Sequence, residues 1–298
     1  MKDIISIVIR LVVTCLLAAT VMGFTFIFTS NAKKHNEHAR EQQVMFKLMG
    51  FEDKASIPDT VAMHELYRYV VTGQESQSIA YLIPAGHGED GGFTFVNIDL
   101  AGKMLETKQV TLSEADSRES ELRDKAMADA AGAGFTVEFA DQTVVISDDG
   151  NRIAYLLSGK FQGFKTFINV MLAVDPDFSM IGLEILEHEE DPGLGAEIEK
   201  DYFKNQFKGK SFEWLKNVQV IKEPIPTEYL AALNGKVSED DIMKLRAQYT
   251  DQDIYALTGA TISTKAVSNG VKGIVKKFAY RVTILDKVLK EQQLAVSF

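Results

Sequence analysis

The stretch Thr258-Gly259-Ala260-Thr261-Ile262-Ser263-Thr264-Lys265 stands directly before the most regular apolar pattern in the chain. Small and apolar residues then recur at intervals of three and four, which predicts an amphipathic helix; they are Ala266, Val267, Gly270, Val271, Ile274, Val275 and Phe278. The hydroxyl groups of Thr261, Ser263 and Thr264 are suited to cap this helix. Glycine lets a ligand approach the backbone, and the first N–H groups of a helix are unpaired and positively polarised. The pattern therefore fits either an ordinary capped helix start or a phosphate-binding site.

Residues 258–263 resemble the (Ser/Thr)-Gly-Ala-Thr-x-(Ser/Thr) flavin-attachment motif. That motif belongs to the FMN-binding domain of the RnfG and NqrC subunits of membrane redox pumps. In this family the second threonine joins the FMN phosphate through a phosphodiester bond, and the matching residue here is Thr261. The resemblance implies that the neighbouring motif residues contact the cofactor as well; these are Thr258, Gly259, Ala260, Ile262 and Ser263.

A second segment, residues 188–195, resembles the His-x-Glu-Thr-Pro-Gly-Leu-Gly sequence of the same family, with Asp191 in place of the threonine. Two glycines around one leucine allow a tightly bent, exposed backbone that suits contact with a planar ring. The resemblance implies that the flavin ring lies against Pro192, Gly193, Leu194 and Gly195, with Glu190 as a hydrogen-bonding candidate. Without the family, the same residues fit a turn before a helix over 197–207. The resemblance covers about residues 150–278.

Composition narrows the partners and cofactors. The chain has 298 residues and a formal net charge of −10, which argues against a nucleic-acid surface because binding phosphate backbone needs clustered lysine and arginine. The single cysteine, Cys15, excludes an internal disulfide and a cysteine-ligated iron–sulfur cluster or zinc site within this chain. His35 and His38 have no carboxylate partner in register, so no metal site is expected.

Residues 11–29 contain no charged side chain, and about 18 to 20 apolar residues are enough to cross a bilayer. We expect an uncleaved single-pass anchor; a cleaved signal peptide is the alternative. The basic residues on the two sides of the span do not decide its orientation. A short N-terminus with a large C-terminal part fits export, and the resemblance implies the same. The expected location is the inner (cytoplasmic) membrane, with the C-terminal domain on the extracytoplasmic or periplasmic side.

The predicted fold class is α+β. We expect a transmembrane anchor (1–32), a helical linker (33–59), an additional α+β region (60–149), an FMN-binding domain with antiparallel sheet and flanking helices (150–280) and a C-terminal helix (281–298). Residues 60–149 either add strands to the same domain or form a lobe that meets a partner. Period-two patterns predict strands over 93–98, 108–112 and 152–157, a hairpin over 135–139 and 143–146, and another over 165–174 and 180–186. Helices are predicted over 119–131 and after Ser238.

The resemblance implies a membrane-anchored electron-transfer subunit with covalent FMN in an ion-translocating ferredoxin:NAD oxidoreductase complex. Its expected partners are the other membrane subunits, a flavin transferase that attaches the FMN, and the lipid bilayer. No catalytic residue is assigned, because no basic side chain adjoins Thr261 in sequence to activate its hydroxyl, and the subunit is not expected to catalyse turnover alone. Two alternatives stay open: an NqrC-like subunit of a sodium-pumping quinone reductase, and a cofactor-free extracytoplasmic scaffold or binding module.

Overall fold

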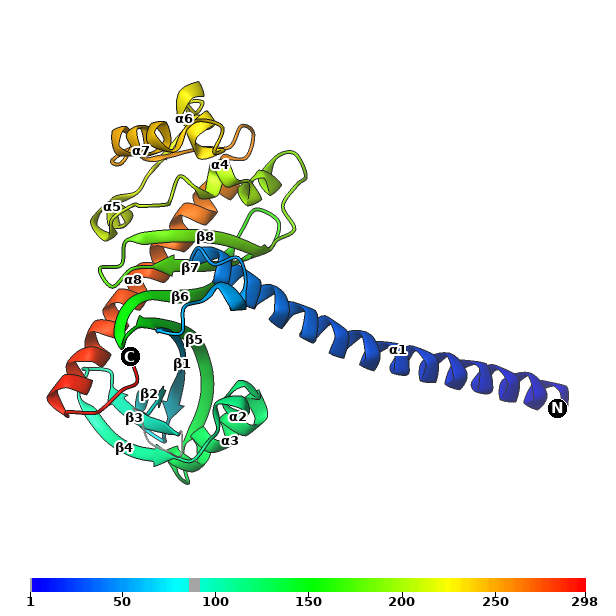
Figure 1. The fold of residues 1–298 in the computed structure, drawn as a ribbon. Helices are drawn as coiled ribbons and strands as arrows, with labels where there is room; N and C mark the ends of the chain where they lie inside the picture. The colour runs from blue at the N-terminus through cyan, green and yellow to red at the C-terminus, as the bar shows by residue number, and fades with distance from the viewer. Residues whose placement is uncertain (1, 86–91) are drawn as a thin grey trace.

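A curved antiparallel sheet with a long helix on each side of it forms the body of the protein (Figure 1). The computed structural model describes residues 2–85 and 92–298, with the backbone alone for residues 2, 3, 27 and 30–38. The N-terminal helix α1 (Lys2–Leu48) projects away from the sheet, and α8 (Thr261–Glu291) lies along it. The predicted α+β class is confirmed.

The sheet has eight strands in the order β4-β3-β2-β1-β5-β6-β7-β8, and every neighbouring pair is antiparallel. The strands are β1 (Val61–Thr72), β2 (Gln77–Pro84), β3 (Phe93–Asp99), β4 (Met104–Val110), β5 (Thr136–Asp148), β6 (Asn151–Gln162), β7 (Phe167–Val174) and β8 (Met180–Glu187). Five of them come from residues 60–149. This region therefore extends the sheet of the C-terminal domain, which was the first of the two alternatives.

One predicted hairpin is wrong. Residues 135–146 do not turn back on themselves, because β5 is one strand that pairs along its whole length with β1. Arg68 pairs with Asp141 and Tyr69 with Phe139, so Ala140 is an extra residue that bulges out of the ladder. The bulge absorbs the polar residues that suggested a turn. The hairpin of β7 and β8 is confirmed.

The helices that follow the sheet are short. They are α2 (Glu114–Arg118), α3 (Ser120–Ala131), α4 (Asp201–Lys204), α5 (Phe212–Asn217), α6 (Thr227–Leu233) and α7 (Glu239–Gln248), with 3-10 turns η1 (Lys54–Ser56) and η2 (Gly195–Glu199) and the parallel pair β9 (Val220–Ile221) and β10 (Ile254–Tyr255). The single helix predicted over 197–207 is wrong, because Lys200 adopts an extended conformation (φ −72°, ψ 144°) between η2 and α4.

Two apolar layers pack against opposite faces of the sheet. Side chains alternate along a strand, so Val145 and Leu157 join α8 in one cluster while Ile146 and Leu156 join the end of α1 in another. The stripe predicted on α8 is confirmed, since Val267, Val271, Val275 and Phe278 are buried. The stripe continues without a break to Leu289, so the helix expected over 281–298 is the second half of α8 up to Glu291.

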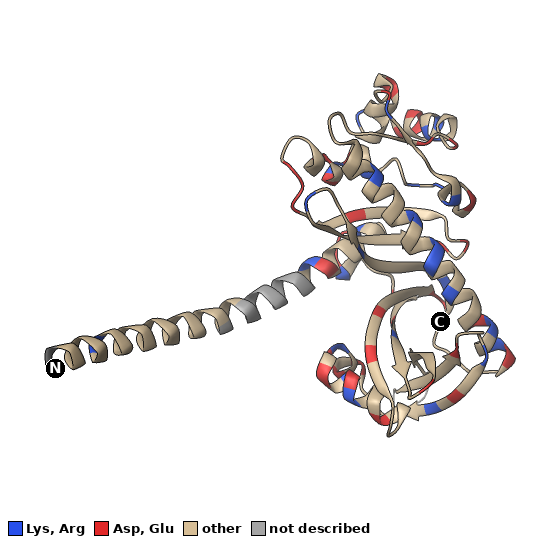
Figure 2. Cartoon of the chain, turned by 180° about the vertical axis from the view of Figure 1, so that it is seen from behind, with Lys and Arg blue, Asp and Glu red and all other residues tan. Residues whose placement is uncertain are grey.

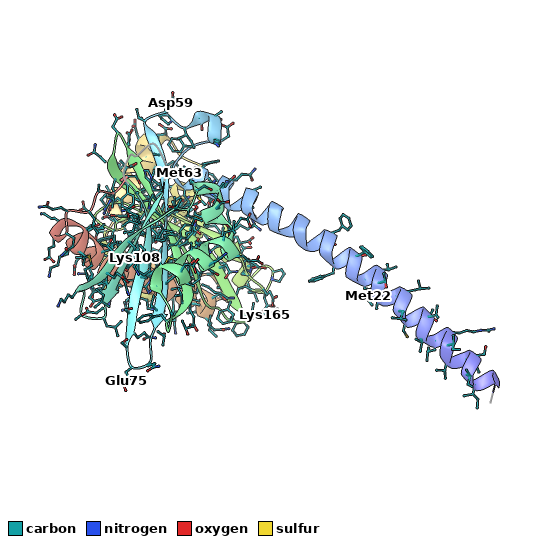
Figure 3. The ribbon with its side chains drawn as sticks, turned by 90° about the horizontal axis from the view of Figure 1, so that it is seen from below. Met22, Asp59, Met63, Glu75, Lys108 and Lys165 are labelled. Carbon is teal, nitrogen blue, oxygen red and sulfur yellow. The ribbon has the colours of Figure 1, made fainter. Side chains whose placement is uncertain are left out.

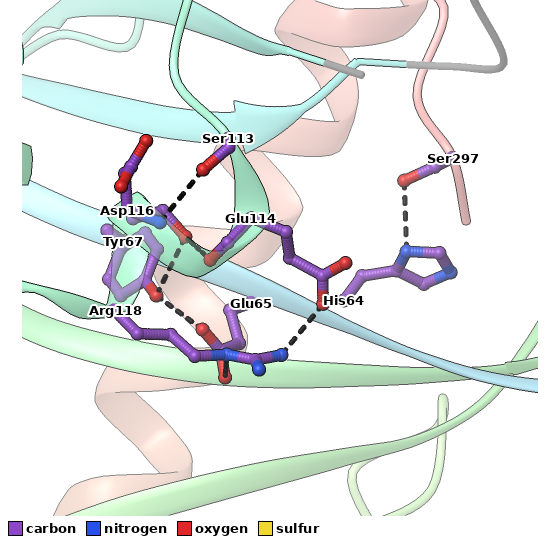
Figure 4. A network of polar contacts seen from close by, with 9 residues as sticks. His64, Glu65, Tyr67, Ser113, Glu114, Asp116, Arg118 and Ser297 are labelled. Atoms are coloured by element: carbon purple, nitrogen blue, oxygen red, sulfur yellow. Dashed lines mark hydrogen bonds and ion pairs between the residues drawn. The ribbon is translucent and has the colours of Figure 1, made fainter. Parts of the chain in front are cut away.

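Polar contacts attach the peripheral segments to the central strand β1 (Figure 4). Arg118 at the end of α2 donates to Glu65 at 3.1 Å, and the Tyr67 hydroxyl donates to the same carboxylate. On the same strand, His64 Nδ1 lies 3.1 Å from the Ser297 hydroxyl. The C-terminal residues are therefore held against β1, next to the strands contributed by residues 60–149.

Helix α1 contains a stretch, Ile4–Phe26, with a mean hydropathy of 2.5 and no buried part. Its 23 residues span about 35 Å at 1.5 Å per residue, enough to cross a hydrocarbon core of about 30 Å. This part of α1, which includes Met22, stands clear of the folded body (Figure 3). The helix runs on to Leu48, which packs on the sheet, so most of the expected linker is the second half of α1.

Candidate functional site

The first turn of α8 has no side-chain cap. Its N-cap residue is Ala260, and no side chain of the described residues accepts a capping hydrogen bond there. The predicted capping by Thr261, Ser263 and Thr264 is wrong, because the two buried hydroxyls have other partners. Thr264 accepts a hydrogen bond from the Leu257 N–H at 3.1 Å, and Ser263 donates to Glu190. The polarised N–H groups that begin a 31-residue helix are therefore left for another acceptor.

Glu190 joins three segments that are distant in sequence. Its side chain is 4% exposed. One carboxylate oxygen accepts from the Phe164 N–H at 2.8 Å and the Lys165 N–H at 3.2 Å, and the other accepts from the Ser263 hydroxyl. The carboxylate thereby fixes the turn after β6, the loop of residues 188–195 and the start of α8 relative to one another.

The 188–195 loop and the 258–261 loop are in direct contact. A Cβ at Gly259 would lie 2.8 Å from Leu194 Cδ2, and Gly259 has a φ of +74° that side-chain-bearing residues rarely adopt. A Cβ at Gly195 would lie 2.7 Å from the Glu190 carboxylate and 2.8 Å from the Ser263 hydroxyl. Glycine at both positions is therefore required for the two loops to meet.

The surface formed by these loops is open and partly apolar. Thr258, Gly259, Pro192 and Gly193 are exposed, and the Thr261 side chain is half-buried. Large apolar side chains stand in solvent around them: Phe164 is 55% exposed, Leu194 45% and Ile262 60%. An exposed apolar surface next to unpaired helix N–H groups suits a ligand with a phosphate at one end and a planar ring at the other.

The attachment loop is supported from behind by two residues of the segment 206–210. The Gln206 side chain accepts from the Tyr255 N–H at 2.8 Å and donates to the Tyr255 carbonyl at 3.3 Å. The Lys210 ammonium donates to the carbonyls of Tyr249, Thr250 and Gln252. Burial lowers the pKa of Lys210 to about 8. These bonds hold the chain that leads into Thr258.

Charged groups at the rim are mostly paired. Lys165 forms an ion pair with Asp191, and this contact raises the pKa of the lysine; Figure 3 shows Lys165 at the edge of the folded body. His188 Nε2 lies 2.9 Å from Glu199, while its Nδ1 accepts from the Glu190 N–H at 3.0 Å. Asp191, the residue that replaces the family's threonine, therefore attaches the loop to the turn after β6.

The structure brings the two predicted segments together at one place, although they lie about 70 residues apart in the chain. Glu190 and Ser263, predicted as cofactor contacts, bond each other below the surface, and their direct contact with a flavin stays a prediction. The contribution of Phe164 and Lys165 was not predicted from the sequence. The Gly163-Phe164 pair at the end of a strand pattern was the only signal, since a Cβ at Gly163 would lie 2.5 Å from Glu190.

Comparison with known proteins defines the class. Residues 163–276 match the family model of the FMN-binding domain, so this part of the chain is an FMN-binding domain, and the predicted resemblance is confirmed. The match begins at Gly163, on the turn that Glu190 holds, and contains both loops of the site. Among the residues that the structure describes, no group of three or more metal-ligating side chains is present.

The chain is similar to RnfG subunits of ion-translocating complexes. It is 35% identical over 129 residues to the RnfG subunit of the proton-translocating ferredoxin:NAD(+) oxidoreductase complex of Clostridium ljungdahlii, covering 43% of this chain and 55% of that one. It is 27% identical over 124 residues to the corresponding subunit of the Na(+)-translocating complex of Acetobacterium woodii, covering 41% and 48%. The chain spans about half the length of these curated relatives. The crystal structure of Shewanella oneidensis NqrC aligns with a TM-score of 0.42 at 16% identity, covering 80% of this chain and 91% of that one.

Proposed function

We propose that the protein is a membrane-anchored electron-transfer subunit of an ion-translocating ferredoxin:NAD oxidoreductase complex, with FMN bonded through its phosphate to Thr261. The observation that carries the proposal is the position of Thr261. It is the first residue of α8, half-buried, at an uncapped helix start where the loops of residues 188–195 and 258–261 meet. When bound, FMN supplies the redox chemistry, and the protein supplies attachment, burial and hydrogen bonds.

The phosphate end is supported by backbone groups. The N–H groups at the start of α8 and the positive end of its dipole favour an anion at Thr261 Oγ1. Gly259 lets the backbone approach closely, because no side chain covers it. The exposed Lys265 lies one turn further along α8 and adds positive charge near the same place.

The ring end is supported by the apolar rim. Leu194 and Ile262 flank the loop contact, and Phe164 lies on the turn that Glu190 holds. Covering these side chains with a flat ring removes exposed apolar surface from water, which is worth about 25 cal/mol per Å². Ring atoms that stay uncovered are accessible to a partner subunit for electron transfer.

The membrane helix supports anchoring beside other membrane subunits, as the names of the relatives suggest. We propose that α1 crosses the cytoplasmic membrane and that the domain lies on its extracytoplasmic side. A covalent bond has a physical purpose there, because an exported domain cannot readily recapture lost FMN. Attachment would be carried out by a separate flavin transferase.

The test is flavin fluorescence after denaturing electrophoresis, using full-length protein made together with a flavin transferase. The wild type is expected to give a fluorescent band, and the peptide that contains Thr261 is expected to carry the added mass of FMN less one water. Thr261→Val is expected to remain folded and dark. Thr258→Val is the matched control, because it removes a hydroxyl from the same loop at an exposed position.

A dark wild type, or a fluorescent Thr261→Val variant, would refute covalent attachment at this residue. If the wild type is dark and also binds no added FMN, the cofactor-free scaffold becomes the better description. Co-purification of the neighbouring subunits separates the ferredoxin:NAD complex from an NqrC-like quinone reductase, since the subunits of the two assemblies have different partners.

A further inference from the structure

A cavity of about 230 Å³ lies between α8 and the sheet, well away from the flavin site. Its inner wall is apolar and is formed by Leu66, Leu157, Ile274, Phe278, Val282 and Leu285. The cavity residues on α8 begin at Ile274, 13 positions after Thr261, which corresponds to about 20 Å along the helix. The two sites therefore do not share a residue.

The cavity exists because two neighbouring strands separate. Strands β5 and β6 are paired only from Asp148–Asn151 to Thr143–Leu157. Beyond that point β5 continues alongside β1 and β6 continues alongside β7. The bulge at Ala140 lies in the separated part of β5. The opening is thus built into the sheet by the register of the strands.

The polar side of the cavity is strongly basic. Arg68, Lys160, Lys277 and Arg281 line it together with a single carboxylate, Asp141. This concentration of positive charge stands out in a chain with a formal net charge of −10. Figure 2 shows lysine and arginine at intervals along α8, from which two of the four cations come.

The one carboxylate does not satisfy the cations around it. Asp141 accepts from Arg68 Nε at 2.8 Å and from a terminal nitrogen of the same guanidinium, and from Arg281 Nη1 at 2.8 Å. Each guanidinium carries five N–H donors, so most of them remain for a ligand. Lys160 and Lys277 form no ion pair with any residue of 2–85 or 92–298 whose side chain is described.

We propose that this cavity binds a small amphipathic oxyanion, with its phosphate or carboxylate group at Arg68, Arg281 and the two lysines and its apolar part against α8. Guanidinium groups match the two oxygens of such anions. The ion pairs with Asp141 hold both arginines in place before the ligand arrives. Tyr81 also lines the cavity, and burial raises its pKa to about 12, so its hydroxyl stays protonated and is able to donate to the anion.

The ligand's chemistry could come from a soluble organic phosphate or from an anionic lipid headgroup. The experiment uses purified full-length protein in neutral detergent and measures binding of phenyl phosphate and inorganic phosphate by calorimetry. A second arm compares nanodiscs containing phosphatidylglycerol with nanodiscs of phosphatidylcholine alone, using the thermal midpoint of unfolding.

The test variant is Lys160→Gln/Lys277→Gln. The matched control is Lys272→Gln/Lys276→Gln, which removes the same charge from α8 outside the cavity lining. Phenyl phosphate is expected to bind more tightly than inorganic phosphate, and the test variant is expected to weaken it about tenfold or more, because two charge-assisted contacts are lost. The control is expected to bind like the wild type.

A stabilisation by phosphatidylglycerol that the test variant loses and the control keeps would support the proposal and identify the lipid as the source. Equal binding of inorganic and phenyl phosphate would refute the amphipathic ligand. Equal weakening in both double variants, or no binding of any probe, would refute the site. Flavin fluorescence in the gel is expected to be unchanged in both variants, so a failure of this proposal is distinguishable from a failure of the flavin assignment.

Discussion

Replacing Glu190 is expected to separate the two loops of the flavin site. The carboxylate is 4% exposed and accepts three hydrogen bonds, from the Phe164 and Lys165 N–H groups and from Ser263. Glu190→Ala leaves three donors without their acceptor in a buried place. A buried unsatisfied donor costs roughly 1–3 kcal/mol; allowing for water that enters the space, the loss in unfolding free energy is about 3–5 kcal/mol.

The assay is thermal unfolding of the detergent-solubilised protein, followed by circular dichroism. A loss of 1 kcal/mol lowers the midpoint by roughly 2–4 °C in a domain of this size, so Glu190→Ala is expected to lower it by about 6–20 °C. Glu190→Gln keeps one oxygen for the two N–H groups and places an amide opposite the Ser263 hydroxyl, which is able to accept. The expected cost of this change is smaller, about 1–2 kcal/mol.

Glu189→Ala is the matched control, because Glu189 is the exposed neighbour of Glu190 and exposed substitutions change stability by about 0.5 kcal/mol or less. A double-mutant cycle with Ser263→Ala is expected to give a coupling of about 1–2 kcal/mol with Glu190→Ala. Equal unfolding temperatures for Glu190→Ala and Glu189→Ala, or a cycle without coupling, would show that the carboxylate does not hold the loops together.

Three further changes test other parts of the structure. Gly195→Ala places a methyl group 2.7 Å from the Glu190 carboxylate and is expected to lower the unfolding midpoint by several degrees, whereas Gly193→Ala, with open space around it, tests backbone strain alone; equal effects would contradict the steric explanation. Burial lowers the pKa of Lys210 from 10.5 to about 8, so between these values the unfolded chain binds more protons and unfolding free energy is expected to rise with pH; Lys210→Met should lack this rise, and an identical pH profile would refute it. In a Cys15→Ser background, Glu239→Cys on α7, which is exposed, is expected to react with a membrane-impermeant maleimide in spheroplasts, and labelling only after lysis would place the domain in the cytoplasm.

Local patterns predicted the parts of the fold that depend on local contacts. The apolar stripe of α8 needs only a period of three to four, and the hairpin of β7 and β8 is closed by a short turn around Asp175. Ser238 caps α7 through the Asp241 N–H, as its position in the sequence indicated. These elements form from neighbours in the chain, so their signals are present in short windows of sequence.

Elements that depend on distant partners were predicted poorly. No strand was predicted over residues 61–84, although β1 lies at the centre of the sheet. Its polar residues Arg68 and His64 conceal the alternation, and they are tolerated because Asp141 and Ser147 on β5 pair with them. The same pairing made one strand of β5, where the polar residues around Ala140 suggested a turn.

The flavin site shows the same division between motif and geometry. Each of its two segments was recognisable on its own, and the glycines in them indicated bent backbone. Their mutual position depends on Glu190 and Ser263, whose hydrogen bond spans 73 residues of sequence and leaves no local pattern. The hydroxyls that resemble helix caps are instead internal fasteners, and because Ser263 and Thr264 are occupied in this way, the helix start at Thr261 remains open to an external anion.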